Sequence, residues 1–203
     1  MPKEIERVHE VLRQKDKARE KSIRELRLLI RVCGDGIRAL HRGDLEAAKE
    51  RIEEGAQIAG QVAQDLKKHP DLYHSSMVTS GLTEYAELTM IFKLLTKKKI
   101  PGMDEIDVPP AAYLNGMGDA IGEIRRHILD LLRRRQTKEA EEYLEIAENI
   151  HNLLMGFDYP KALVGDLRRR LDVARSLLEK TRADVTNAVL QEDLSRKLEA
   201  YRG

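Results

Sequence analysis

Residues 81–95 read GLTEYAELTMIFKLL, and this stretch decides the fold class. Apolar residues lie on nearly every side of a helix drawn through it, and between Tyr85 and Phe92 the only charged residue is Glu87. A helix that is apolar nearly all round is buried in a protein core. The stretch therefore predicts a buried helix, which continues to about Lys98.

Apolar residues recur every three or four positions in five other segments, as helices require. The first series runs from Ile23 to Leu40, and the last carries Leu167 to Ala188. Turns separate the segments, and Asp44 and Thr137 are candidate N-caps for the helices beside them. Aromatic residues make up 4% of the chain and Trp is absent, and this composition argues against a β-sandwich. The sequence predicts an all-α, single-domain bundle of long helices, with six segments over residues 1–203.

Composition limits the classes of function. The formal net charge of +1 argues against a protein that coats nucleic acid through overall charge, but it permits a locally basic cavity. Cys33 is the only cysteine, which excludes an intrachain disulfide and a Cys-rich zinc site. No apolar run approaches the roughly 18–20 residues of a membrane span. The first residues, MPKEIERVHE, lack the apolar core of a secretion signal. We expect a cytoplasmic protein without a membrane partner.

Two carboxylates lie where a core is expected. Met77, Gly81, Leu88 and Ile91 mark an apolar seam along the buried helix, and Glu84 occupies a position in that seam. Glu87 follows at i+3, so both side chains can point to one site. A buried ionised carboxylate is expensive unless it is paired or binds a metal.

A second acid pair lies on the helix predicted from Pro109 or Pro110 to about Arg135. Asp119, Glu123 and His127 share a face that differs from the apolar stripe of this helix. Glycines at 116, 118 and 122 crowd the same stretch, and each costs about 1 kcal/mol relative to alanine. Close approach of another helix or of a ligand is the usual reason for such glycines.

Glu84, Glu87, Asp119 and Glu123 together form a set of hard oxygen donors. Such donors suit Mg²⁺ or Mn²⁺ better than zinc or copper. One or two such ions can promote phosphodiester cleavage. The alternative is that the four acids pair with buried Arg or Lys side chains, and the spacing alone leaves this alternative open.

Basic clusters are the candidates for phosphate binding. They occur at 97–99, 125–126, 133–135 and 168–170. Each is equally compatible with a solvated face, and those at 97–99 and 133–135 suit helix C-termini. Arg125 and Arg126 are the strongest candidates because they lie beside Glu123 and His127. His127 and His74 are further candidates for contact with nucleic acid, with a surface or packing role as the alternative.

Two motifs resemble those of a known family. Residues 81–87, GLTEYAE, resemble the GLxEYxE motif of the catalytic branch of the translin family, represented by translin-associated factor X. Residues 113–123, YLNGMGDAIGE, resemble the family's YLxGxxDxxGE, and 71–74, DLYH, resemble the segment before the first motif. Gly156-Phe157 and the long segment after them resemble its closing region. The resemblance spans roughly residues 60–185, with both motifs in the family's order.

The resemblance implies an all-α bundle of about seven helices and Mg²⁺-dependent endonucleolytic cleavage of single-stranded RNA. It places the family's catalytic, metal-binding acids at Glu84, Glu87, Asp119 and Glu123. It also implies assembly into a closed homo-octameric shell that handles RNA inside, with single-stranded DNA as a further candidate ligand. The loop before Pro109 is shorter than in the eukaryotic factor, which works beside translin, so the need for a second subunit stays open. The alternative function is a non-catalytic oligomer that binds single-stranded RNA or DNA.

Overall fold

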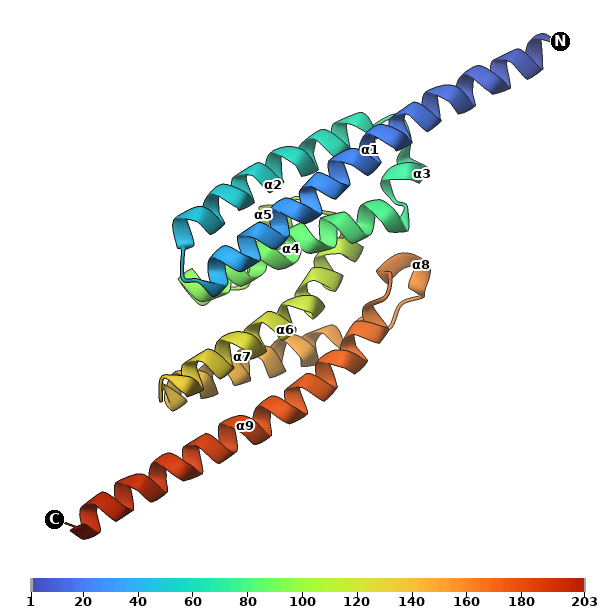
Figure 1. Cartoon of the computed structure of the whole chain (residues 1–203). Coiled ribbons are helices and arrows are strands. Elements are labelled where there is room, and N and C mark those ends of the chain that lie inside the picture. Colours follow the sequence, from blue (N-terminus) through green and yellow to red (C-terminus); the bar gives the residue numbers. More distant parts are fainter. Residues whose placement is uncertain (1, 203) are drawn as a thin grey trace. The chain divides into compact units, whose positions relative to one another are not determined.

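The computed structural model describes residues 2–202, and this part of the chain folds into helices without strands (Figure 1). This part of the chain contains six long helices and three helices of a single turn, which confirms the predicted all-α class and the six long segments. The chain forms two compact units, Met1–Gly116 and Met117–Gly203. The expectation of a single domain stays a prediction.

The first unit is built on a helical hairpin. Gly43 has a φ of 76°, a left-handed conformation that suits glycine, and it turns the chain between the two hairpin helices. Asp44 caps the second of them as predicted, because its carboxylate accepts a hydrogen bond of 3.1 Å from the backbone N–H of Ala47. The helices of this unit are α1 (Lys3–His41), α2 (Leu45–Asp65), α3 (Pro70–Tyr73), α4 (Ser76–Lys97) and α5 (Met103–Ile106).

Helix α4 packs against both α1 and α2 (Figure 1). Leu29 of α1, Val62 of α2 and Leu88 of α4 are fully buried in this three-helix core. Lys98 has a φ of 49° and ends α4 in the left-handed conformation, one residue from the predicted end. The predicted buried helix is therefore the helix that closes the core of the first unit.

The second unit contains the main part of α6 and three further helices. Helices α7 and α9 pack against each other, and Leu144, Ile150 and Leu178 lie in their shared core. Pro110 is the first residue of α6, where its missing N–H costs nothing. The helices are α6 (Pro110–Arg133), α7 (Thr137–Leu154), α8 (Lys161–Val164) and α9 (Leu167–Arg202).

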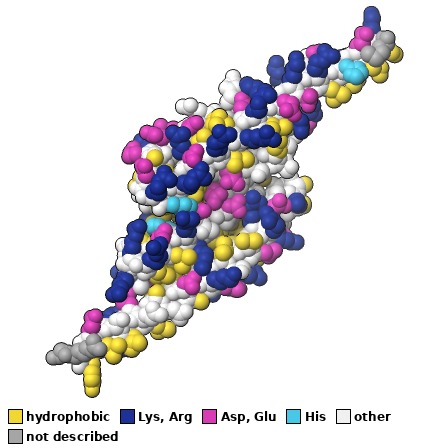
Figure 2. Space-filling model, viewed as in Figure 1, with side chains coloured by type: hydrophobic (Ala, Val, Ile, Leu, Met, Phe, Trp, Pro, Cys, Tyr) yellow, Lys and Arg dark blue, Asp and Glu magenta, His cyan; other side chains and the backbone are white. Residues whose placement is uncertain are grey.

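Helix α9 changes its apolar face along its length. Its buried residues share one face: Leu167, Leu171, Ala174, Leu178, Thr181 and Val185. At 3.6 residues per turn, a second apolar stripe lies about half a turn away from that face. This stripe is exposed and consists of Leu190, Leu194, Leu198 and Tyr201, and hydrophobic side chains are visible along these last turns in Figure 2. The first turns of α1 also expose apolar side chains, at Ile5, Val8, Val11 and Leu12.

One helix start differs from the sequence-based expectation. Helix α1 begins at Lys3 and so extends N-terminal to the apolar series that starts at Ile23, although these earlier turns are mostly exposed. Thr137 is the first residue of α7 and Gln136 is its N-cap, so the predicted cap is wrong. The Thr137 hydroxyl donates instead to the carboxylate of Glu192 on α9. Among the described residues, no helix combines the length and apolar character that a membrane span needs.

Candidate functional site

The first acid pair lies in the most buried part of α4. From Gly81 to Ile91 every residue is buried except Glu84 and Glu87, which are half-buried. The buried hydroxyls in this stretch bond within the helix, since Thr83 donates to the Thr79 carbonyl at 2.8 Å and Thr89 to the Tyr85 carbonyl at 2.9 Å. Glu84 and Glu87 are thus the only acidic side chains among the mostly apolar residues of this part of α4.

Cys33 of α1 lies within the electrostatic reach of this acid pair. Burial, and then the negative charges of Glu84 and Glu87, raise the pKa of the Cys33 thiol to about 12. A thiol with so high a pKa stays protonated at neutral pH and is a poor nucleophile. Cys33 is therefore a structural residue of the α1–α4 core.

We expect Cys33 to resist alkylation in the native protein. The raised pKa lowers the thiolate fraction by roughly 1000-fold at pH 8 relative to an ordinary thiol, and burial adds a steric barrier. Mass spectrometry after iodoacetamide treatment at pH 8 should show unmodified Cys33 in the native state and complete modification in guanidinium. Rapid alkylation of the native protein would contradict the close packing of α1 on α4.

The glycine at 116 is explained by close helix packing. A Cβ atom at Gly116 would lie 2.7 Å from the Ala86 Cβ and 2.9 Å from both the Glu87 backbone nitrogen and the Thr83 carbonyl oxygen. The first turns of α6 therefore rest directly on the backbone of α4 beside Glu87. This confirms, for Gly116, the expectation that another helix approaches closely.

The second acid pair lies on α6 in the second unit. Arg170 of α9 donates its Nε–H to both carboxylate oxygens of Asp119, at 2.9 and 2.8 Å. The side chains of Arg170 and Asp119 are 19% and 29% exposed, so this is a partly buried ion pair. Glu123, one turn further along α6, is half-buried. In this structure Asp119 therefore forms an ion pair, which is the alternative to metal binding that the sequence left open.

The donor set fits a hard divalent cation in its chemistry, because all four side chains are carboxylates and none is thiolate or imidazole. Neither unit contributes more than two of them. In residues 2–202, no three or more His, Cys, Asp or Glu side chains are grouped so that they could hold a metal ion. Metal binding by all four acids stays a prediction, and it requires Asp119 to exchange its contact with Arg170.

The residues expected to contact nucleic acid differ in their surroundings. Arg125 is tied to α9, since its guanidinium donates to the Thr181 hydroxyl at 2.6 Å and to Asp184 at 3.0 Å. Arg126 is exposed. His74 is exposed in the first unit, where its ring lies 5.2 Å from that of Tyr73. Arg126 and His74 are therefore accessible, whereas Arg125 braces α6 against α9.

His127 packs edge-on against Tyr143 of α7, with 4.5 Å between the ring centroids. Burial lowers its pKa below 6.5. Of the surrounding charges, Glu139 and Asp130 oppose this shift and Arg134 adds to it, each less than burial does. His127 is accordingly a neutral packing residue at pH 7.

The His127 environment predicts a pH dependence of stability. Below about pH 6.5 the unfolded chain takes up a proton on His127 before the folded chain does, so the free energy of unfolding falls as the pH falls through the lowered pKa. The variant His127→Gln should lose this component. Urea titrations at pH 7.5 and 5.5 should show a smaller difference for the variant than for the parent protein. Equal differences would show that His127 titrates alike in both states.

Arg170 was missed as a partner of Asp119. The sequence shows residues 168–170 only as a basic run, because no periodicity joins residues 51 positions apart. The geometry thus defines an all-helical protein that carries one acid pair on α4 and another, held by an arginine, on α6.

Comparison with known proteins agrees with this description. The model of the translin family matches residues 3–185, and the chain belongs to this family. An uncharacterised protein of Methanocaldococcus jannaschii is 30% identical over 195 residues, which cover 91% of this chain and 84% of that protein.

Solved structures share the fold. One described as a complex of AfC3PO with duplex RNA has a TM-score of 0.85 and 28% identity, covering 93% of this chain and 97% of that one. A crystal structure of AfC3PO has a TM-score of 0.83 and 29% identity, covering 93% and 98%. A crystal structure of apo-NeC3PO, with a TM-score of 0.82 at 23% identity over 93% and 98% of the two chains, supports the fold alone.

Proposed function

We propose that this protein is a metal-dependent endoribonuclease that hydrolyses phosphodiester bonds of single-stranded RNA. The observation that carries the proposal is the complete set of four carboxylates, Glu84, Glu87, Asp119 and Glu123, within two motifs that resemble those of the translin family's catalytic branch. The half-buried position of Glu84 and Glu87 in an otherwise buried stretch supports it, because such acids require compensation. RNA as the ligand is supported by the similar AfC3PO, whose structure is described with duplex RNA.

In this proposal the four carboxylates hold one or two Mg²⁺ ions, and Mn²⁺ is an alternative. Divalent ions of this kind promote phosphodiester hydrolysis by activating water and by neutralising charge on the reacting phosphate. The protein's own contribution is to hold Glu84 and Glu87 half-buried on α4, where contact with bulk water is reduced. Arg170 balances the charge of Asp119 before a metal ion binds.

The same proposal includes a homo-oligomer in the cytoplasm, with the octameric shell implied by the family resemblance. The exposed apolar side chains at both ends of the chain support self-association, because contiguous apolar patches on a surface mark interaction sites. Leu190, Leu194 and Leu198 on α9 form the longest such stripe, together with Tyr201.

A non-catalytic oligomer that binds single-stranded RNA or DNA is the second candidate. One observation favours it: Arg170 already satisfies both oxygens of Asp119 without any metal. In that case the acids on α6 are structural ion-pair partners.

The deciding experiment is cleavage of a labelled single-stranded RNA by the purified protein, with Mg²⁺ or with EDTA. A Glu84→Ala/Glu87→Ala double variant, checked for folding by circular dichroism, serves as the control. Cutting that depends on metal and is lost in the variant supports the nuclease. Tight binding without cutting supports the second candidate, and cutting that survives the substitutions identifies a contaminant or another site.

A further inference from the structure

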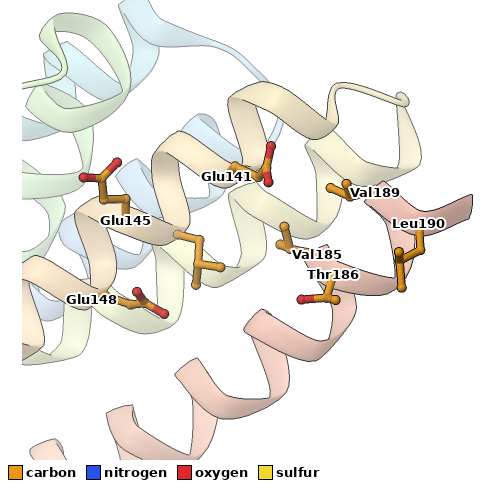
Figure 3. Close-up of a pocket in the computed structure, with 8 residues that line it drawn as sticks. Glu141, Glu145, Glu148, Val185, Thr186, Val189 and Leu190 are labelled. Carbon is orange, nitrogen blue, oxygen red and sulfur yellow. The ribbon is translucent and has the colours of Figure 1, made fainter. Parts of the chain in front are cut away.

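Three pockets in the second unit differ in the charge they present. The pocket between α7 and α9, about 330 Å³, is lined on one side by Glu141, Glu145 and Glu148 (Figure 3). Its opposite side is Val185, Thr186, Val189 and Leu190 of α9. Among the residues that the structure describes, only Glu148 of these three acids has a cationic partner, since Arg182 donates to it at 2.9 and 2.7 Å. Such a pocket repels a phosphate.

The pocket around α8 and the start of α9, about 660 Å³, contains cations that its own acids neutralise. Lys161 pairs with Asp166 at 2.7 Å, and Arg168 pairs with Asp158 at 3.1 Å. Arg169 also lines this pocket, but it has no ion-pair partner among the described residues. Its charge contributes to the lowered pKa of Asp166, but less than Lys161 does.

The pocket between α6 and α9, about 160 Å³, presents an excess of positive charge. Arg169 and Arg170 line it together with one carboxylate, Asp119, over a floor that contains Gly118 and Gly122. Arg170 uses only its Nε–H for Asp119, and its Nη nitrogens make no hydrogen bond to any described residue. A guanidinium has five N–H donors, so the Nη donors of Arg170 are available to an anion.

Packing does not explain the two glycines in the floor. A Cβ atom at Gly118 would lie 3.5 Å from the Arg170 Cβ, and one at Gly122 would lie 3.9 Å from the Leu177 Cδ1. Both distances are ordinary van der Waals contacts, unlike those at Gly116. Glycine inside a helix is destabilising relative to alanine. The side chains missing at Gly118 and Gly122 instead leave the pocket its volume beside Asp119.

We propose that the α6–α9 pocket is a subsite for a backbone phosphate of the RNA, held by the guanidinium groups of Arg169 and Arg170. The inference rests on the proposed function for the identity of the ligand as RNA. Arginine suits this role because its fork of donors matches phosphate oxygens. Arg170 then has two roles: its Nε–H positions Asp119, and its Nη donors contact the phosphate.

The test measures the affinity of the full-length protein for a fluorescein-labelled 12-nucleotide oligouridylate in EDTA, where cleavage cannot interfere. The variants are Arg169→Gln, which removes a guanidinium without an ion-pair partner among the described residues, and Gly122→Ala, which reduces the pocket. Arg175→Gln is the matched control, because Arg175 is exposed on another face of α9 and loses the same charge.

We expect Arg169→Gln to weaken binding about 10-fold or more, as loss of a charge-assisted contact requires. The slope of log K against log salt should fall by about 0.7 for Arg169→Gln, which is the value for one phosphate contact on a single strand. Gly122→Ala should weaken binding while raising the melting temperature, a combination that a purely structural glycine does not give. The control should change both quantities by less than half as much.

Two outcomes separate this inference from the proposed function. If Arg169→Gln and Arg175→Gln bind equally, the subsite is wrong even when the parent protein cuts RNA with Mg²⁺. If the parent protein binds RNA through Arg169 but never cuts it, the subsite stands and the nuclease is wrong. Affinity unchanged by Gly122→Ala, together with a higher melting temperature, would place the phosphate outside the pocket and overturn the inference.

Discussion

Replacing Gly116 by alanine should destabilise the protein by about 2–3 kcal/mol, because the new Cβ meets backbone atoms that cannot rotate away. The three nearest atoms belong to Ala86, Glu87 and Thr83 of α4, at 2.7–2.9 Å. The start of α6 must move away from α4, and this movement outweighs the gain of about 1 kcal/mol that alanine brings to a helix. The melting temperature should fall by about 5–10 °C.

The same substitution at Gly122 provides an internal control. There the added Cβ reaches no atom closer than 3.9 Å, so alanine should stabilise the helix by about 0.5–1 kcal/mol. Calorimetry of the two variants should therefore show shifts of opposite sign from identical changes in one helix. A stable Gly116→Ala variant would show that the contact between α6 and α4 is looser than described.

Replacing any one of the four acids by its amide should lower kcat for RNA cleavage by at least about 100-fold. The variants Glu84→Gln, Glu87→Gln, Asp119→Asn and Glu123→Gln keep the side-chain volume but remove the charge that a divalent ion requires. Losses of this order are typical when one electrostatic contact to the transition state is removed. Single-turnover cleavage of labelled RNA, with the affinity measured separately in EDTA, distinguishes loss of chemistry from loss of binding.

Glu179→Gln is the matched control for these variants, since Glu179 is an exposed acid on α9 and its loss changes the net charge equally. It should cut RNA at the rate of the parent protein. A residue whose amide variant keeps more than about one tenth of the activity does not belong to the catalytic set. Asp119→Asn also leaves Arg170 without its carboxylate, so its melting temperature should be measured beside its activity.

The buried stretch of α4 was predictable because a buried helix has a continuous apolar pattern within its own segment of the sequence. Apolar residues on all sides between Tyr85 and Phe92 identify the helix, and any charged residue among them is conspicuous. Glu84 and Glu87 could therefore be singled out without any other information. Gly116 was harder to single out, because Gly118 and Gly122 give the same signal in the same helix although no atom would lie closer than 3.5 Å to a Cβ there.

The parts that escaped prediction depend on partners remote in the chain. The pairing of Arg170 with Asp119, and of Arg125 with Asp184, follows from how α9 lies along α6 within the second unit. The hydroxyl of Thr137 contacts Glu192 and does not cap its own helix, for the same reason. The spacing of charged residues along one helix carries no information about such contacts.

We expect the folding of the last turns of α9 to depend on protein concentration, because their apolar stripe is exposed and suits contact with another copy of the chain. Amides between Leu167 and Val185 are held by the core of the second unit, so their rates of hydrogen exchange should not vary with dilution. Glu192 is still held to α7 by the Thr137 hydroxyl, whereas the amides beyond it lie in turns whose apolar side chains, Leu194, Leu198 and Tyr201, are exposed. Their hydrogen exchange should accelerate as the protein is diluted. The exchange rates at the end of α9 would then report how much of the protein is assembled.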